Sequence, residues 1–377
     1  MNEPFAPTFH DWSSAASAIG DDLAARAAKH DADGTFVADG YARLKADGFF
    51  SALVPAELGG GGAGVGEMMR AIRVLGAGCG STALAFSMHS HVVAVNAWRW
   101  RHQQAPTDGM LKRVAAENLI MVSSGGSDWL ASAGTATKAD GGFRINARKG
   151  FASGSPVGDL LATSVVYDDP EAGPTVLHFP LSLKAEGISI NCNWDVMGMR
   201  GTGSQEVVIK DVFLPDALVL GRRPQGQWHM LFHIISMIAM PMILAAYVGI
   251  AEGARAKALA LATRKGEDDI TLALVGELEN HFAATDMAFV RLLDLADNGA
   301  PGPSNTNRVM IAKTLATQSA IATVDKAMEI AGGASFYRKL GLERAFRDIQ
   351  AARFHPLQEK PQQRFAARLA LGLDIDG

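Results

Sequence analysis

The chain is predicted to fold as an α+β protein of three parts: an all-α N-terminal domain (1–117), a central antiparallel β domain (118–225) and a C-terminal four-helix bundle (226–377). Two observations predict this order. Apolar residues recur at helical spacing in the first and third parts, whereas they alternate with polar residues in the second. In addition, 377 residues are more than one compact core usually contains.

Helical spacing is clearest in the N-terminal part where Leu23 and Ala27 lie one turn apart, and again at Met68, Ile72 and Leu75. Glycine-rich segments at 59–66 and 76–80 interrupt this pattern, and we expect them to separate helices.

Two-residue alternation marks the central part. Phe143 and Ile145 alternate with Arg144 and Asn146, and turn-forming residues follow at 168–170. Runs of this kind, separated by turn signals, predict six to eight short antiparallel strands.

Four long apolar-periodic stretches predict the C-terminal bundle: roughly 228–264, 270–298, 306–331 and 342–372. Residues 231–251 are nearly free of charge and long enough to span a membrane. Because His233 and Pro241 interrupt them and no basic cluster flanks them closely, we expect a buried core helix instead.

Composition narrows the functional classes. The net charge is −4 and no run of Lys or Arg is present, so we expect no nucleic-acid partner and no membrane. The 2 cysteines cannot form a disulfide framework, and the first residues lack the features of a secretory signal. A cytoplasmic location is therefore expected.

Generic catalytic motifs are not supported. Residues 59–64 match G-x-G-x-x-G formally, but their helical surroundings favour an inter-helix loop. The sequence has no P-loop lysine motif, no HExxH and no CxxC, and no metal is expected. His89 and His91 would point to different faces of a helix, which disfavours a shared metal.

Several short motifs occur in a recognisable order. They read L-V-P-A-E-L-G-G, S-G-G-S-D, K-G-F-A-S-G, M-G-M-R-G-T and A-G-G followed by R-D, at residues 53–60, 124–128, 149–154, 197–202, 331–333 and 347–348. Together with the α–β–α order, they resemble the acyl-CoA dehydrogenase superfamily of flavoproteins over nearly the whole chain.

The resemblance implies a flavin held between the β domain and the bundle of a homodimer or homotetramer, with a neighbouring subunit completing the site. Ser123 would face flavin N1 and O2, Ser153 would face N5, and Phe151 would lie against the ring. The resemblance also implies cofactor binding by three further residues, of this subunit or of a neighbouring one: Ser127, Gly332 and Gly333.

Three departures from the family pattern matter. Pro356 stands where dehydrogenases commonly carry the glutamate that removes an α-proton, and His355 precedes it. The acidic loop before the G-S-D motif is shortened to Ser123 and Ser124. Residues 264–268 do not match the segment that usually clamps the flavin diphosphate, so the cofactor is expected to be FAD or FMN.

A histidine at this C-terminal place resembles the flavin-dependent monooxygenase branch of the fold, of the dibenzothiophene monooxygenase and 4-hydroxyphenylacetate hydroxylase type. That branch takes reduced flavin from a separate reductase and oxygenates a small organic substrate through a flavin C4a-hydroperoxide. The implied catalytic residues are His355 and Ser153, with His89 as a third candidate. His91 and His233 are expected to be structural.

Two alternatives stay open. The chain could be a true acyl-CoA dehydrogenase that acts on an acyl-CoA thioester with His355 or an unrecognised base. It could also be an inactive helical interaction module, although the surviving Ser153, Gly332 and Gly333 argue against this.

Overall fold

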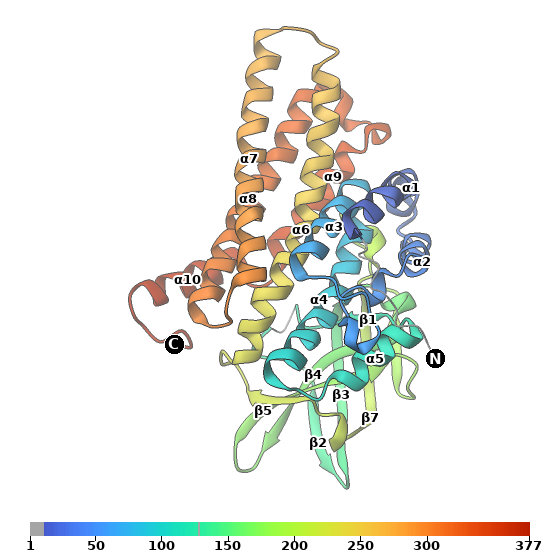
Figure 1. Cartoon of the computed structure of the whole chain (residues 1–377), viewed down its shortest axis with the longest axis vertical. Coiled ribbons are helices and arrows are strands. Elements are labelled where there is room, and N and C mark those ends of the chain that lie inside the picture. Colours follow the sequence, from blue (N-terminus) through green and yellow to red (C-terminus); the bar gives the residue numbers. More distant parts are fainter. Residues whose placement is uncertain (1–10, 127–128) are drawn as a thin grey trace, which may run out of the picture.

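The computed structural model describes residues 11–126 and 129–377. The predicted fold class is confirmed: helices, a mainly antiparallel sheet and again helices follow one another along the chain. In Figure 1 the sheet forms the lower part of the molecule, the long C-terminal helices extend upward, and the N-terminal helices pack beside both.

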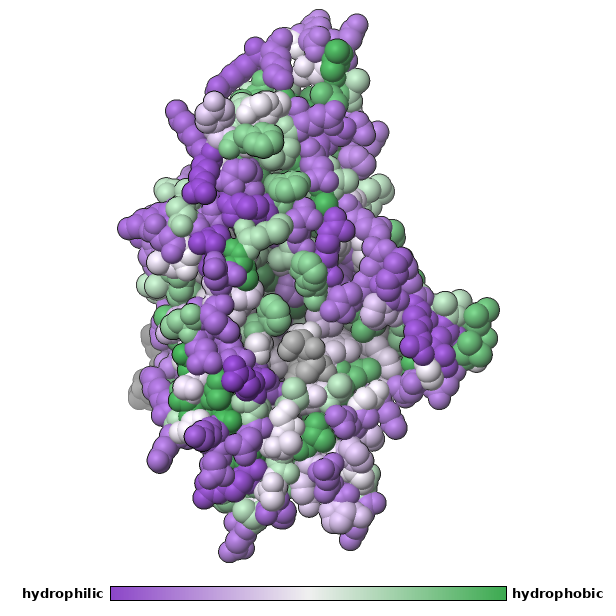
Figure 2. Space-filling view, turned by 180° about the vertical axis from the view of Figure 1, so that it is seen from behind, coloured by the Kyte–Doolittle hydropathy of each residue, from purple (hydrophilic) through white to green (hydrophobic). Residues whose placement is uncertain are grey.

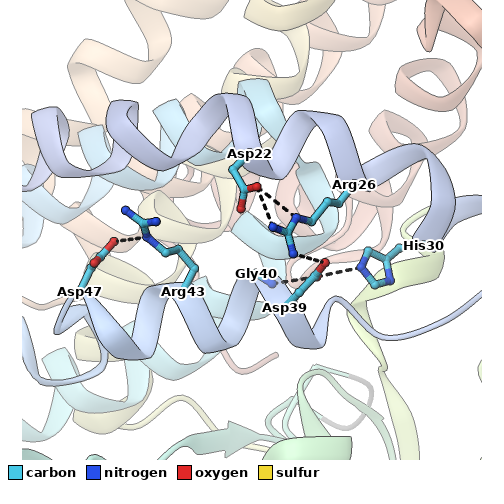
Figure 3. Close-up of polar contacts among 7 residues, drawn as sticks. All are labelled: Asp22, Arg26, His30, Asp39, Gly40, Arg43 and Asp47. Carbon is cyan, nitrogen blue, oxygen red and sulfur yellow. Dashed lines mark hydrogen bonds and ion pairs between the residues drawn. The ribbon is translucent and has the colours of Figure 1, made fainter.

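Among the described residues, the N-terminal part has five α-helices: α1 (Trp12–Asp33), α2 (Ala38–Ala46), α3 (Val65–Gly78), α4 (Gly80–Gln103) and α5 (Asp108–Glu117). The Asp11 side chain caps α1 by accepting hydrogen bonds from the backbone N–H groups of Ser13 and Ser14. Polar contacts join α2 to α1, since Asp39 accepts from Arg26 at 3.2 Å and contacts His30 Nε2 at 2.8 Å (Figure 3).

The central sheet has eight strands among the described residues: β1 (Met121–Ser123), β2 (Thr135–Ala139), β3 (Gly142–Ala152), β4 (Leu160–Asp169), β5 (Gly173–Ser182), β6 (Ile188–Asn191), β7 (Gln205–Pro215) and β8 (Gly221–Pro224). Its order is β6-β7-β3-β2-β4-β5-β8, with β1 added beside β4. Two pairs, β1 with β4 and β2 with β4, are parallel, which the alternation pattern could not predict. The other pairs are antiparallel, as expected.

The C-terminal part contains three long helices, α6 (Met230–Ala262), α7 (Asp269–Asn298) and α8 (Pro303–Ala331). The fourth predicted helix is broken into α9 (Leu342–Ile349) and α10 (Glu359–Ala370). Pro356 lies in the break, where a proline disfavours helical backbone in the residue before it. The connection between α9 and α10 thus becomes a loop that carries His355, which has extended backbone angles.

Two hydrophobic cores hold the fold together. One joins α1, α3, α4, α6, α7 and α8, and the other fills the sheet. Helix α6 is the one described helix long and apolar enough to cross a membrane, but 94% of its most apolar window is buried inside the molecule. Its burial on all sides explains its composition. The proposed domain boundaries at 117 and 225 fall in the connections before β1 and before α6.

Candidate active site

A cavity of about 710 Å³ lies where the sheet, α4, α6 and the α9–α10 connection meet. Its size is that of a pocket for a cofactor or a drug-sized molecule. Most of its lining is apolar, with Met88, Met240 and Ile243 as examples, and a few polar groups interrupt it. None of the described lining residues is aspartate or glutamate.

His355 and Tyr247 form a hydrogen-bonded pair in this lining. Tyr247 lies in the middle of α6, and its Oη is 2.7 Å from Nε2 of His355. Burial raises the pKa of Tyr247 well above its ordinary value. Burial, helped by the positive charge of Lys313, lowers the pKa of His355 to about 3. Both groups are therefore neutral at pH 7, so they can share a proton without holding a charge in the cavity.

Lys313 of α8 fixes the loop that carries His355. Its Nζ donates to the backbone carbonyls of His355 at 2.9 Å and Leu357 at 2.7 Å. Burial lowers the pKa of Lys313 to about 8, so it remains mostly protonated at pH 7. The ammonium group thus positions His355 and also helps to keep its imidazole neutral.

His91, and not His89, lines the cavity. Nδ1 of His91 donates to the Ser87 carbonyl at 3.0 Å, so Nε2 accepts from the Ser123 hydroxyl at 3.2 Å. Burial lowers the pKa of His91 to about 4, which agrees with this neutral form. Ser123 therefore donates its hydroxyl hydrogen bond to His91 and offers the cavity an acceptor oxygen.

His89 lies outside the lining, behind α4. Its Nδ1 accepts from the backbone N–H of Met121 at 2.9 Å, and its Nε2 donates to the Phe50 carbonyl at 2.8 Å. Both ring nitrogens are thus used by the backbone, and burial lowers the pKa of His89 to about 4. This geometry indicates a structural role for His89, which the sequence offered as a third catalytic candidate. His91 lines the cavity instead.

Three hydroxyl groups form a chain that begins at Ser153. Thr202 Oγ1 donates to the Met199 carbonyl at 2.9 Å, so it accepts from Ser204 Oγ at 2.7 Å. Ser204 has then used its proton, and it accepts from Ser153 Oγ at 2.8 Å. Ser153, which lines the cavity, consequently presents an acceptor oxygen there.

Phe151 lines the same cavity with 59% of its surface exposed, and its ring packs edge-on against Trp194 at 5.8 Å. Its φ of +58° is rare for a residue with a side chain. Met199, also in the lining, has φ +55°. Trp129, a third lining residue, has φ +28°. Unusual backbone of this kind is typical of functional sites.

Gly332 and Gly333 lie apart from the cavity lining, in a short 3-10 helix after α8. Gly332 has φ +60°, and no atom lies within 4 Å of a Cβ built at either glycine. Phe336 and Tyr337 beside them are 84% and 72% exposed. Ser127 lies outside the described residues. The structure thus brings together Ser123, Phe151, Ser153 and His355.

The R-D motif locks the M-G-M-R segment to α9. Arg347 donates to the Met197 carbonyl at 2.9 Å and pairs with Asp31 at 2.6 Å, while Asp348 accepts from the Met199 N–H at 2.5 Å. Gly198 permits this contact, because a Cβ there would lie 2.3 Å from the Arg347 carbonyl oxygen. Two motifs distant in sequence therefore build one wall of the cavity.

The pH dependence of stability tests whether Asp348 is buried in this contact. Burial raises its pKa to about 6, from 3.8 in the unfolded chain. The native state then keeps a proton that the unfolded state has lost, so this stabilisation is present below about pH 4 and is lost as the pH rises to about 6. Asp348→Asn keeps an acceptor for Met199 but has no proton to lose. We therefore expect its free energy of unfolding to lack the fall of about 3 kcal/mol that Asp348 causes between pH 4 and pH 6. Urea unfolding at several pH values measures it.

The control is Asp211→Asn, which removes a carboxylate whose side chain is 69% exposed. Equal pH profiles for native protein and Asp348→Asn would contradict the assignment of the buried proton to Asp348.

Sequence reasoning missed Tyr247, His91 and Arg99 as lining residues. A signal existed for Tyr247, since a tyrosine in an apolar helix needs a partner for its hydroxyl. No signal existed for choosing His91 over His89, because α4 is buried on nearly all sides over residues 80–95 and hydropathy does not show which face meets the cavity. Among the described residues, no group of three metal-binding side chains is found.

Comparison with known proteins agrees with this fold. The family model "Acyl-CoA dehydrogenase, N-terminal domain" matches residues 13–105, and "Acyl-CoA dehydrogenase, C-terminal domain" matches residues 241–359. Isobutylamine N-hydroxylase of Streptomyces viridifaciens is 30% identical over 340 residues, with 87% of each chain covered. YdbM of Bacillus subtilis (strain 168), whose name assigns it provisionally to the acyl-CoA dehydrogenases, is 28% identical over 372 residues, with 92% of each covered.

A solved structure extends the comparison. KijD3 in complex with FMN and dTDP-3-amino-2,3,6-trideoxy-4-keto-3-methyl-D-glucose superimposes with a TM-score of 0.90 at 27% identity, covering 99% of this chain and 96% of that one. A helical domain, a sheet and a bundle around an apolar cavity define the class of flavin-dependent oxidoreductases with this fold. The chain belongs to the acyl-CoA dehydrogenase family within that class.

Proposed function

We propose that this protein is a flavin-dependent monooxygenase that oxygenates a small organic substrate. The observation that carries the proposal is the chemistry of the cavity lining, whose described residues include no carboxylate. Removal of an α-proton from a thioester needs a positioned base, and a buried carboxylate is the group the dehydrogenases use. Here His355, with a pKa of about 3, is a weak base.

The lining fits a flavin. The cavity of about 710 Å³ can hold an aromatic ring system together with part of a small substrate, and Phe151 supplies an exposed aromatic face. Ser123 and Ser153 would bind polar edges of the ring. Because Ser153 offers an acceptor, it suits the N–H that a flavin carries at N5 when reduced. The cofactor would be FMN or FAD, and FMN is the flavin in the KijD3 complex.

A reduced flavin would supply the electrons with which molecular oxygen is activated. The protein's own contribution is to exclude water and to place protons. Apolar residues of α4 and α6 line most of the cavity, and the neutral His355–Tyr247 pair can hold or release a proton at Nε2 and Oη. His91 keeps the Ser123 hydroxyl oriented by accepting a hydrogen bond from it.

The proposal also includes the oligomeric state of the protein and the source of its reduced flavin. Exposed Phe336 and Tyr337 beside Gly332 and Gly333 support a homodimer or homotetramer in which this segment meets a neighbouring subunit. Other exposed apolar side chains lie in small groups among polar ones on the face in Figure 2. Reduced flavin would come from a separate reductase, in the cytoplasm.

The test is rapid mixing of the flavin-loaded, anaerobically reduced protein with oxygen. We expect a transient absorbing species before oxidised flavin returns, because the apolar lining excludes water. Free reduced flavin mixed in the same way is the control. A direct return to oxidised flavin, with bleaching of the oxidised protein by acyl-CoAs, would instead establish an acyl-CoA dehydrogenase, the activity that the name of YdbM suggests for that relative. A protein that takes up no flavin would contradict both.

A further inference from the structure

One end of the cavity is rich in hydrogen-bond donors. Arg99, on the last turns of α4, is half-buried and lines it, and its Nη2 donates to the Leu220 carbonyl at 3.2 Å. Burial lowers the pKa of Arg99. A guanidinium has five N–H donors. Among the described residues no carboxylate offsets the effect of burial on Arg99.

Two further donors belong to His178 and Trp129, which line the cavity and whose rings lie 6.3 Å and 4.8 Å from the ring of Phe232. Nε1 of Trp129 is buried without a hydrogen-bond partner, although it belongs to a lining residue. His178 Nε2 accepts from Arg223 at 3.1 Å, so the ring of this neutral histidine carries its proton on Nδ1. Burial and the charges of Arg223 and Arg99 lower the pKa of His178 to about 3. Leu220 links the two residues, because its carbonyl accepts from Arg99 and its N–H donates to the His178 carbonyl at 2.8 Å. A buried donor without a partner costs free energy unless a ligand supplies an acceptor.

We propose that the Arg99 end of the cavity binds an oxyanionic group, such as a carboxylate, of the substrate. Most of the remaining lining is apolar, and none of its described residues is acidic, so these residues place no negative charge against an entering anion. This inference rests on the proposed function only in placing the reaction at the His355 end.

The distance between the two ends of the cavity indicates how long the substrate is. His91 lies near the reacting end, and Arg99 follows it by eight residues on the same helix. At a rise of 1.5 Å per residue, the two positions are about 12 Å apart along α4. The substrate class is therefore an elongated organic anion with an apolar body, oxidised at the end remote from its charge.

Calorimetric titration of the flavin-free protein tests this without any turnover. Octanoate and octan-1-ol are the probes, since they share an apolar chain and differ in charge. We expect octanoate to bind more tightly, and Arg99→Gln to weaken octanoate at least about tenfold, or about 1.4 kcal/mol, while octan-1-ol is unaffected. Arg99→Lys keeps the charge and should retain part of the preference.

Arg101→Gln is the matched control, because Arg101 is two residues further along α4 and pairs with Glu57 on the surface. Equal affinities for the two probes in the native protein, or unchanged octanoate binding in Arg99→Gln, would overturn the proposal. If Arg99→Gln does not fold, the native preference and the Arg99→Lys variant decide. If FMN or coenzyme A loses affinity in Arg99→Gln while octanoate does not, the site holds a cofactor or nucleotide phosphate, and the substrate anion is excluded.

Because these titrations use no flavin and no oxygen, they can fail while the oxygen reaction succeeds, or succeed while it fails. The two proposals are thus tested separately.

Discussion

Replacing His355 by alanine is expected to shorten the lifetime of the transient species formed with oxygen by about two orders of magnitude. The imidazole is the lining group that shares a proton with Tyr247, and its removal leaves the buried tyrosine hydroxyl without that partner. Water can then occupy the vacated volume, and uncontrolled proton transfer becomes possible. Rapid-mixing absorbance measures the lifetime, and flavin fluorescence measures whether the cofactor still binds.

Two further variants test whether the shorter lifetime depends on the His355–Tyr247 pair. Tyr247→Phe removes only the hydroxyl, so it should shorten the lifetime in the same direction but by less, because the imidazole remains. His102→Ala, at an exposed histidine of α4 outside the described cavity lining, should behave as the native protein. If His355→Ala binds flavin and reacts like the native protein, the catalytic role of His355 is wrong in both the monooxygenase and the dehydrogenase interpretation.

In the proposed function His355 acts as a neutral imidazole, and its surroundings keep it neutral. The Nζ of Lys313 lies 2.9 Å from the backbone carbonyl of His355, and burial together with this positive charge disfavours protonation of the imidazole. The protein thus combines a basic group with an environment that opposes its protonation. Such a histidine accepts a proton only transiently, which suits a site where a proton must be passed on.

The large-scale fold was predictable because periodicity changes twice along the chain, and each change marks a different way of burying apolar side chains. The broken last helix was not predicted, although Pro356 is a recognised stop signal. Apolar spacing continues on both sides of the break, so the pattern at 342–372 favoured a single helix. The loop that results is the one that carries His355.

Site residues were predictable only where a motif marked them. His355 and Ser153 were found through their position relative to family motifs, and both line the cavity. Tyr247 and Arg99 lie in helices outside these motifs. A sequence does not show which side of the fully buried helix around Tyr247 meets a cavity, and an arginine at the partly exposed end of α4 resembles an ordinary surface residue. The direction of the Ser153 hydrogen bond depends on Thr202, through Ser204, and such a chain appears only when side chains are placed in space.

Gly198→Ala is expected to destabilise the native state by about 3 kcal/mol, because the new Cβ would lie 2.3 Å and 2.4 Å from the carbonyl oxygen and carbon of Arg347. These are backbone atoms of α9, so no flexible side chain can move aside. The M-G-M-R segment would have to separate from Asp348, which accepts from Met199 there. Urea unfolding measures the loss, and flavin affinity should fall with it, since Gly198 and Met199 line the cavity.

Gly276→Ala is the same substitution at another position, and we expect it to change the free energy of unfolding in the opposite direction. Gly276 is exposed in the interior of α7, and nothing lies within 4 Å of a Cβ built on it. Alanine is the better helix former, so we expect a gain of roughly 0.5–1 kcal/mol and unchanged flavin affinity. If both variants unfold alike, the close approach of Gly198 to Arg347 does not hold the two motifs together. If Gly198→Ala alone loses stability and flavin together, the packing of the segment against α9 is what shapes the cavity wall.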